Sequence, residues 1–346
     1  MIPRVKLAKK PAKKQQGVAL IVVLMLLAMM TLLAVQMTDR LQHNFYRVES
    51  QIQHQQAYWY SMGLEALAKV AIKEGIDDSD TVNLSQAWAT KGQRYPLEGG
   101  DAVGDILDRQ ACFNLNALSA VAPEPDRSTK PYLIKVLQAL LEESGIESYE
   151  AEVMTESAWE FVDPDDTVQS AFGAEDSTYE GFKPAYLPAN HLMADMSELR
   201  AVNGVTATAF NQVKRAVCAL PVDTFKLNVN TVSENNAALL AALFTPELSV
   251  SDAKTLLTNR PYDGWQNVDE FFAENVIARI DGAIQSKAKE HIDIKSDYFQ
   301  LDAEILVDRA RVRVVALLKR DEQKQVTVVR RRYGGISERV ADNQAK

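Results

Sequence analysis

The sequence lacks the motifs of the common enzyme classes. Its 346 residues include only two cysteines and four histidines, and no Gly-x-Ser-x-Gly, His-Glu-x-x-His or phosphate-binding glycine loop occurs. Nucleophilic catalysis needs a base beside the nucleophile. The histidines lie in no recognisable catalytic context; they are His43, His54, His191 and His291. We therefore expect a protein that is not an enzyme.

Charge is absent from one long stretch and unbalanced elsewhere. No charged residue lies between Lys14 and Asp39, whereas residues 1–17 carry six basic residues and no acid. The formal net charge is −9, and without these six basic residues it becomes −15. A chain this acidic repels polyanions, so we expect no nucleic-acid partner.

The uncharged stretch contains an apolar run from Val18 to Val35. At about 1.5 Å per residue, a helix of this length spans the hydrocarbon core of a bilayer. Basic flanks stay on the cytoplasmic side. We therefore expect a single-pass protein of the inner membrane whose C-terminal domain lies in the periplasm.

Three interpretations of the apolar run are open. A secretory signal peptide is removed at a small-x-small site, but the run is long for such a peptide and no good site follows it. An uncleaved signal anchor is the second interpretation. The third depends on Gly17, because a basic leader, a glycine and an apolar helix start form the pattern that prepilin peptidase cleaves. Cleavage then falls between Gly17 and Val18, and the new amino terminus of Val18 is methylated. We favour this third interpretation.

Proline is absent between Pro11 and Pro96, so nothing interrupts a helix that begins in the apolar run. Further along, apolar residues recur at near-helical spacing among polar ones. They are Leu41, Phe45, Val48, Ile52, Tyr58 or Trp59, Met62, Leu67 and Val70. We predict one helix from about Val18 to Lys73, with Gly75 as its C-cap and its second half packed on a soluble domain. The alternative is a membrane helix followed by a separate globular helix.

The fifth residue after the predicted cleavage site is Val22. In most pilin-like subunits this residue is Glu, which pairs in the membrane with the amino terminus of a neighbouring subunit; a buried charge without that partner is costly. A subunit with an apolar residue here can be the first in a filament. With its basic leader, Gly17 and Val22, the chain resembles the K-type minor pseudopilins of the type II secretion system. The resemblance extends over nearly the whole chain.

Strand signals lie at the two ends of the soluble region. Gly99-Gly100 separates predicted strands at 95–97 and 102–108, and alternation with short links predicts an antiparallel meander within 298–333. Helical segments are predicted between them at 131–145, 154–162, 210–218, 235–244, 251–259 and 268–272. This order predicts an inserted α-domain. We expect Arg330-Arg331-Arg332 to form a solvated edge and residues 335–346 a disordered tail.

Two further patterns lie within the helical region. Residues 227–233 echo residues 113–119 in sequence, and a turn at 201–205 between short helices resembles a helix-hairpin-helix. Such hairpins usually grip a DNA backbone. Here Lys214 and Arg215 are nearly the only bases nearby, so internal packing or protein contact is the favoured role.

Five acidic residues form two clusters joined by a loop. They are Asp163, Asp165, Asp166, Glu175 and Asp176. Carboxylates this close repel one another unless they are solvated or neutralised, and calcium suits oxygen ligands on flexible loops. The spacing is not that of an EF-hand, because no glycine stands at the sixth place from Asp163. A solvated acidic loop and a cation site both fit the residues alone.

The resemblance to K-type pseudopilins implies the cation site. In that family a Trp-x-x-x-Asp-x-Asp-Asp stretch followed by Gly-Ala-Glu-Asp-x-x-Tyr accompanies structural calcium. Both patterns occur here, at residues 159–166 and 173–179. The resemblance thus implies calcium as a cofactor, with the five acids as candidate ligands and Asp195 as a weaker one.

Cys112 and Cys218 both lie on the exported side of the predicted membrane helix, where disulfides persist. The sequence alone does not show whether the two residues meet. They form a candidate disulfide.

The predicted fold is α+β: a pilin-like long N-terminal helix packed on an antiparallel sheet, with a large inserted all-α domain that contains helix-hairpin-helix-like elements. The predicted parts are a cleaved leader (1–17), the transmembrane part of the helix (18–38), the helix spine with the first strands (39–110), the inserted domain (111–290), the C-terminal strands (291–334) and a disordered tail (335–346).

The resemblance implies a minor pseudopilin at the tip of the periplasmic pseudopilus. Such a subunit joins the I- and J-type minor pseudopilins and primes assembly for the export of folded proteins across the outer membrane. Prepilin peptidase and the membrane are its other implied partners. The alternative is a membrane-anchored periplasmic binding or enzyme domain without a filament role.

Overall fold

The computed structural model describes residues 17–77, 79–124 and 129–334. Residues 1–16 of the predicted leader and the predicted tail at 335–346 lie outside the described residues. The chain divides into two compact units, Met1–Gln56 and Ala57–Lys346. Each unit is described by itself.

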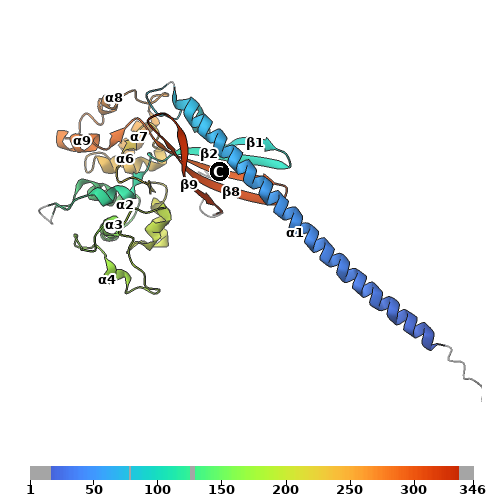
Figure 1. Ribbon diagram of the computed structural model, residues 1–346. Coiled ribbons are helices and arrows are strands. Elements are labelled where there is room, and N and C mark those ends of the chain that lie inside the picture. Colours follow the sequence, from blue (N-terminus) through green and yellow to red (C-terminus); the bar gives the residue numbers. More distant parts are fainter. Residues whose placement is uncertain (1–16, 78, 125–128, 335–346) are drawn as a thin grey trace, which may run out of the picture. The chain divides into compact units, whose positions relative to one another are not determined.

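The first unit is, in its described part, the beginning of helix α1 (Val18–Asp77; Figure 1). Among the described residues, α1 is the one helix long and apolar enough to cross a membrane, by length and composition. All side chains from Val18 to Ile52 are exposed. A helix stretch that is apolar all round and uncovered by its own chain is typical of a membrane span.

Helix α1 continues through Gly75 and ends at Asp77, so the prediction that Gly75 caps it is wrong. The glycine instead permits close packing, because a Cβ at this position would lie 3.0 Å from Cδ1 of Trp88. The buried Trp88 ring is held by a hydrogen bond from Nε1 to Gln86 Oε1 (2.8 Å). Glycine therefore suits position 75, because it leaves room for the Trp88 ring to pack directly on the helix backbone.

The second unit contains a five-stranded antiparallel sheet in the order β1-β2-β7-β8-β9. The strands are β1 (Gln93–Leu97), β2 (Gly100–Asp108), β7 (Tyr298–Val307), β8 (Ala310–Arg320) and β9 (Val326–Tyr333). Gly99 has a φ of +80°, which suits the tight turn between β1 and β2. The predicted hairpin and the predicted C-terminal meander are both confirmed.

The last part of α1 packs on one face of this sheet. Its buried residues are Ala57, Leu64, Ala68, Ile72 and Ile76, which meet Phe299, Leu301, Ala303, Ile305 and Val314 among others. The predicted contact residues are wrong within this unit, since Leu67, Val70 and Trp59 are exposed. Close approach of helix and sheet explains the difference: a Cβ on Gly104 of β2 would lie 3.2 Å from Leu64 Cδ2. Two alanines and three aliphatic residues of α1 therefore face the sheet, and the predicted aromatic and apolar residues lie on another face.

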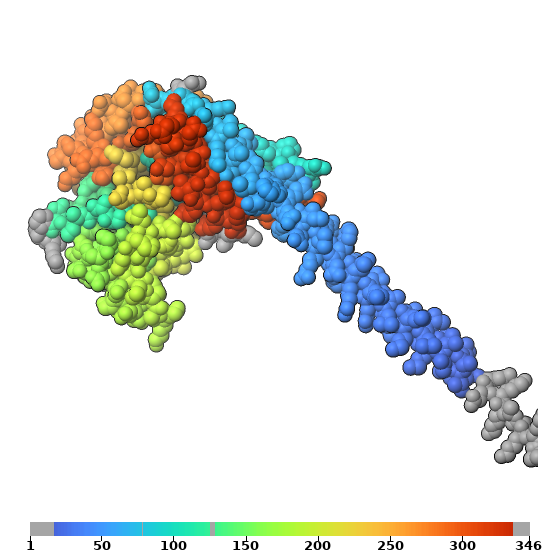
Figure 2. Space-filling view, viewed as in Figure 1, coloured from blue at the N-terminus to red at the C-terminus, as the bar shows by residue number. Residues whose placement is uncertain are grey.

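The three arginines of β9 are ion-paired rather than merely solvated, which corrects the prediction. Arg331 Nε donates to Oε2 of the buried Glu65 on α1 (2.7 Å). Arg330 and Arg332 each reach Asp195 at 3.2 Å. In Figure 2 the red surface of the last strands adjoins the green-to-yellow surface of the region that contains Asp195. The edge strand thus connects the sheet to the helical region.

Residues 109–297 leave the sheet between β2 and β7 and form a second, larger hydrophobic core. The α-helices of this region are α2 (Tyr132–Glu143), α3 (Ser148–Val162), α4 (Asp176–Tyr179), α5 (Ala207–Val213), α6 (Ala237–Leu243), α7 (Val250–Thr258), α8 (Val268–Phe272) and α9 (Gly282–Lys289). Its 3-10 helices are η2 (Leu115–Ala120), η3 (Met196–Ala201) and η4 (Glu234–Asn236). A further 3-10 helix, η1 (Ala87–Ala89), lies before β1. The predicted helix at 210–218 is wrong beyond Val213, because Val217–Cys218 is strand β4.

The helical region is built from two similar halves, which explains the sequence echo. In the first half (residues 113–222), β3 (Phe113–Asn114) pairs in parallel with β4. In the second half (residues 227–294), β5 (Leu227–Asn228) pairs in parallel with β6 (Ile292–Asp293). Each half therefore closes on itself by a short parallel pair between its beginning and its end.

The same asparagine contact anchors each half. Asn116 Oδ1 accepts from Met193 N (2.7 Å) and its Nδ2 donates to Met193 O (2.9 Å). Asn230 Oδ1 accepts from Trp265 N (2.8 Å) and its Nδ2 donates to Trp265 O (2.9 Å). Both asparagine side chains are fully buried. Each one satisfies both polar backbone groups of a single distant residue.

Candidate metal centre

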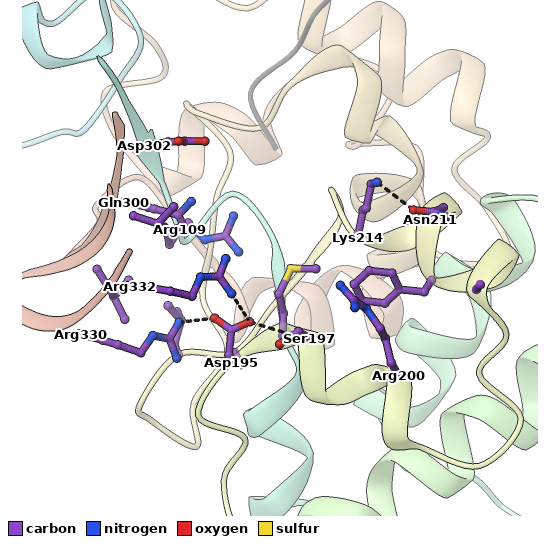
Figure 3. A pocket seen from close by; sticks show the side chains of 17 residues that line it. Arg109, Asp195, Ser197, Arg200, Asn211, Lys214, Gln300, Asp302, Arg330 and Arg332 are labelled. Carbon is purple, nitrogen blue, oxygen red and sulfur yellow. Dashed lines mark hydrogen bonds and ion pairs between the residues drawn. The ribbon is translucent and has the colours of Figure 1, made fainter. Parts of the chain in front are cut away.

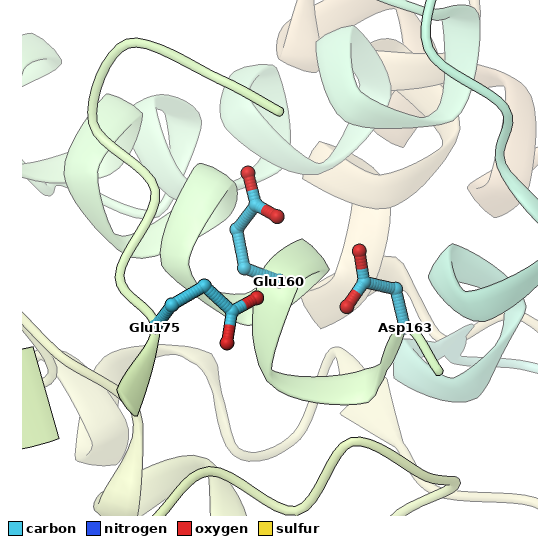
Figure 4. A group of neighbouring side chains, drawn as sticks. All are labelled: Glu160, Asp163 and Glu175. Atoms are coloured by element: carbon cyan, nitrogen blue, oxygen red, sulfur yellow. The ribbon is translucent and has the colours of Figure 1, made fainter. Parts of the chain in front are cut away.

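Three acidic side chains converge at the C-terminal end of α3 (Figure 4). Glu160 lies in the last turn of α3, Asp163 is its C-cap residue, and Glu175 precedes α4 as its N-cap residue. One carboxylate oxygen from each lies within 4.8 Å of the others. All three residues are at least 97% buried. The C-terminus of a helix carries partial negative charge, so the site is unfavourable for uncompensated acids.

Several oxygen atoms of this cluster accept no hydrogen bond within the described part of the chain. They are Glu160 Oε2, Asp163 Oδ1, Gln169 Oε1 and both carboxylate oxygens of Glu175. The remaining oxygens are held by the loop: Glu160 Oε1 accepts from Gln169 N (2.8 Å), and Asp163 Oδ2 accepts from Gln169 Nε2 (2.8 Å). A buried polar atom without a partner is costly, so these oxygens need a proton or a cation.

The pKa values of the cluster reflect the missing counter-charge. Burial, with the neighbouring carboxylates Glu160 and Asp165, raises the pKa of Asp163 to about 7. Burial and the charge of Asp163 raise the pKa of Glu175 to about 8. Burial also raises the pKa of Glu160, although hydrogen bonds from Gln169 and Ser170 oppose the shift. None of the three forms an ion pair with a described lysine or arginine.

The donor set fits a hard divalent cation. Clustered carboxylate oxygens, an amide oxygen and net negative charge are the ligand chemistry of calcium, which takes six to eight oxygens. A cation would occupy the side of each carboxyl group that has no hydrogen-bond donor. The partnerless oxygens therefore agree with a metal site at this position.

The structure brings together two of the five predicted acids and adds one that the sequence reasoning missed. Asp163 and Glu175 belong to the cluster, whereas Asp165 and Asp166 are exposed and Asp176 lies in the first turn of α4. Glu160 was missed. Its signal was present, because residue 160 lies on the predicted helix 154–162 and Asp163 follows directly, so the two residues, three apart, share one side of the helix end.

The weaker candidate, Asp195, lies outside this cluster. It caps η3, where its side chain accepts from Ser197 N (3.0 Å), and it pairs with two arginines of β9. The hydrogen bond and the two arginines outweigh its burial and hold its pKa below the usual value. This acid already has its counter-charge.

The candidate disulfide is present in the structure. Cys112 and Cys218 are bonded, with their Cα atoms 5.9 Å apart. The parallel pairing of β3 and β4 brings the two residues together, since Asn114 lies opposite Cys218 in the register. The bond joins the beginning of the first half to its end.

The N-terminal segment is described from Gly17 onward. Gly17 has a φ of +137°, and α1 begins at the next residue, where Ile21 N donates to Gly17 O (3.2 Å). Val22 lies one turn into the helix and exposes an apolar side chain. A long helix that begins directly after a glycine and packs its last turns on an antiparallel meander defines the class of pilin-like subunits.

Comparisons with known proteins place the chain within that class. Family models described as "Type II secretion system (T2SS), protein K" match residues 111–222 and 227–295, which is nearly the division into two halves. The type II secretion system protein K of Aeromonas hydrophila is 37% identical over 93% of this chain and 98% of its own length. The type II secretion system protein K of Klebsiella pneumoniae is 34% identical over 93% of this chain and 97% of its own length.

A solved structure is similar as well. The matching chain comes from the crystal structure of the GspK-GspI-GspJ complex of the enterotoxigenic Escherichia coli type 2 secretion system; it has a TM-score of 0.77 and 35% identity, and the match covers 84% of this chain and 99% of that one. The chain belongs to the type II secretion system protein K family, the K-type minor pseudopilins.

Proposed function

We propose that this minor pseudopilin forms the tip of the periplasmic pseudopilus, where it joins I- and J-type subunits and primes assembly. The observation that carries the proposal is Val22, an apolar residue on a helix that begins directly after Gly17. A carboxylate at this place needs the amino terminus of a preceding subunit in the membrane. A subunit without it requires no predecessor, which suits the first position.

The partner assignment is supported by the complex in which the Escherichia coli relative was crystallised. The chain also offers a surface for partners on the last part of α1, where Trp59, Leu67 and Val70 are exposed although the opposite face is packed on the sheet. Exposed apolar side chains grouped on one helix face are typical of protein contacts. Neighbouring spine helices are the natural occupants.

Priming depends on membrane extraction. Withdrawing an apolar helix such as Val18–Val35 from lipid is the costly step of filament growth, because its side chains lose their apolar surroundings. Subunits that bind one another at the tip lower this cost by pulling on each other. The helical domain is wide, and at the tip its width does not obstruct the stacking of subunits below.

We further propose that the leader is removed between Gly17 and Val18 by prepilin peptidase, that Val18 is then N-methylated, and that the anchor lies in the inner membrane. Calcium, held by Glu160, Asp163 and Glu175, would neutralise the acids and fix the loop between α3 and α4. In this role the ion is structural and takes part in no reaction.

Two measurements test the proposal. Mass spectrometry of the native amino terminus should find N-methylated Val18; an intact leader favours a membrane-anchored periplasmic domain without a filament role. A Val22→Glu chain should prime assembly less well than the wild type while it still binds the I- and J-type subunits through its soluble part. Equal priming by both chains contradicts the tip assignment, and Val22→Ile is the matched control.

A further inference from the structure

A polar cavity lies between the sheet and the first half of the helical region, away from the acidic cluster. Its volume is about 340 Å³, within the range of roughly 300–1,000 Å³ that small-molecule sites occupy. Figure 3 shows Arg109, Arg330 and Arg332 on one side and Arg200 and Lys214 on the other. The cavity thus concentrates cationic side chains in a chain whose overall charge is negative.

The acids that line this cavity neutralise only part of its charge. Asp195 is shared by Arg330 and Arg332. Asp302 lies 3.0 Å from Arg313, which is outside the cavity lining, and both members of this pair are buried. The lining therefore holds more positive than negative charge. Arg109 is the buried member of the basic set, whereas Arg200, Arg330 and Arg332 are in part open to solvent.

Arg109 is the residue that most needs a partner. It follows β2 and is only 7% exposed. Its backbone is fixed by a hydrogen bond from its amide to Tyr298 O (2.8 Å), and its carbonyl lies beside the Cys112–Cys218 disulfide, 3.0 Å from Cys112 Sγ. In the part of the chain that the structure describes, its guanidinium group donates no hydrogen bond. The Arg109 nitrogens are not among the fully enclosed atoms, so this largely buried guanidinium opens to the cavity, where an acceptor would satisfy its donors.

The pKa of Arg109 also indicates that its positive charge lacks sufficient compensation. Burial lowers the pKa of Arg109 to about 10, and the charge of Arg330 lowers it further, against the opposing effect of Asp195. The side chain nevertheless stays charged at neutral pH. A second negative charge in the cavity would relieve both the desolvation of Arg109 and its repulsion from Arg330.

The remaining wall of the cavity is apolar. It is formed by Met196, Phe210 and Leu220 from the helical region and by Val315 and Leu317 from β8. The guanidinium carbon of Arg200 lies 4.5 Å from the centre of the Phe210 ring, so this arginine covers the aromatic face. An occupant that matches both walls has a negatively charged end and an apolar body.

We propose that this cavity binds a carboxylate attached to an apolar group, with Arg109 as the principal contact to the carboxylate. Guanidinium and carboxylate groups match in geometry and form paired hydrogen bonds. The apolar body lies against Phe210, Leu220 and Leu317. A carboxylate of this kind occurs at the C-terminus of a peptide or on an acidic residue next to an apolar one.

Titration calorimetry on the full chain in a non-ionic detergent tests the proposal, with sodium phenylacetate as the probe. We expect phenylacetate to bind and the neutral phenylacetamide to bind at least about tenfold more weakly, since it lacks the charge. Arg109→Gln should weaken the binding of phenylacetate by about tenfold or more, and Lys214→Gln by less. Arg279→Gln is the matched control, because Arg279 is exposed and lies outside the cavity.

The outcomes are distinct. No heat with phenylacetate, equal binding of the amide, or equal losses in Arg109→Gln and Arg279→Gln would each overturn the proposal. Binding of inorganic phosphate in place of phenylacetate would overturn the carboxylate class. If Arg109→Gln fails to fold, as judged by its melting transition, Lys214→Gln and the amide comparison still decide the question.

A final comparison identifies the source of the natural carboxylate. A chain that ends at Gly334 lacks residues 335–346 and their acids, Glu338 and Asp342. Tighter binding of phenylacetate to this shorter chain means that the protein's own C-terminal segment competes for the cavity. Unchanged binding means that the carboxylate comes from another polypeptide.

Discussion

The two halves of the helical region share a framework of a short parallel strand pair and a buried asparagine. They differ in whether their buried polar side chains find partners within the protein. Both begin with a short strand and a buried asparagine that binds the backbone of a distant residue. In the second half, buried polar side chains find protein partners: Thr231 Oγ1 donates to Asp108 Oδ2 (2.6 Å), and Asn228 Nδ2 donates to Val82 O (3.0 Å). In the first half, Glu160, Asp163 and Glu175 leave oxygens without donors. The framework thus folds with its own hydrogen bonds, whereas the inserted acidic loop depends on an ion or a proton from outside.

The largest expected effect tests what the halves share. Asn116→Leu and Asn230→Leu should each lower the free energy of unfolding by about 2–4 kcal/mol, because buried backbone groups of Met193 or Trp265 lose their partners. Urea unfolding of the full chain in detergent, followed by tryptophan fluorescence, measures both. Asn275→Leu, at an exposed position, is the control and should change little. A large loss in one half alone would show that the two asparagines are not equivalent.

The next effect separates the halves. Calcium at about 100 times its Kd should raise the free energy of unfolding by about 2.7 kcal/mol. Hydrogen exchange should slow at residues 156–175 and stay unchanged at residues 227–294. The substitution Glu175→Gln should reduce the effect, whereas Glu143→Gln, at an exposed acid in the same half, should not. Equal protection of both halves by calcium would contradict the assignment of the site.

A smaller effect concerns pH in the presence of a chelator. The folded-state pKa values of Asp163 and Glu175, about 7 and about 8, lie above those of the unfolded chain. The folded state therefore binds more protons between about pH 4 and pH 8, and stability should fall as pH rises through this window. The melting temperature measured at pH 5, 6, 7 and 8 checks the sign.

Two controls belong to this series. Glu175→Gln removes one of the raised pKa values, so its melting temperature should depend less on pH than that of the wild type. Calcium competes with protons for the same oxygens and should flatten the dependence as well. A wild-type melting temperature that rises from pH 5 to pH 8 without metal would argue against buried, unneutralised acids.

The smallest expected effect lies on the surface of the second half. Lys289 pairs with Asp269, but the two side chains are 52% and 81% exposed. Lys289→Ala should therefore lower the free energy of unfolding by less than about 0.5 kcal/mol. Urea unfolding at low and high salt measures this change. A loss above about 1 kcal/mol would mean that the lysine stem, rather than its charge, packs on Phe272.

Much of the fold was predictable because it depends on local patterns. The meander, the hairpin at Gly99 and helix α8 follow from alternation, turn residues and apolar spacing. The packed face of α1 was predicted wrongly. Trp59 has helical spacing with other apolar residues but is exposed, whereas Ala57, Leu64, Ala68, Ile72 and Ile76 make the contact. Which face a helix buries depends on how closely the sheet approaches, and that distance is a tertiary property.

The candidate site was predictable in part. Asp163 and Glu175 stand at specified positions of a recognisable motif, whereas Glu160 stands at a position where the motif specifies no residue type. The partners of Asp195 and of Arg330 to Arg332 lie more than 130 residues apart in sequence, so no local pattern relates them. The disulfide could not be predicted from a local pattern either, because the pairing of Cys112 with Cys218 depends on the register of β3 and β4.

The Cys112–Cys218 bond also bears on how the protein responds to pulling. The two cysteines are 106 residues apart in the chain, a segment with a contour length on the order of 350 Å when fully extended. A force applied along the polypeptide from α1 to β9 bypasses this segment through the covalent bond. The first half is therefore shielded from mechanical extension while the bond is intact, and only a reduced protein can lengthen by that additional distance under load.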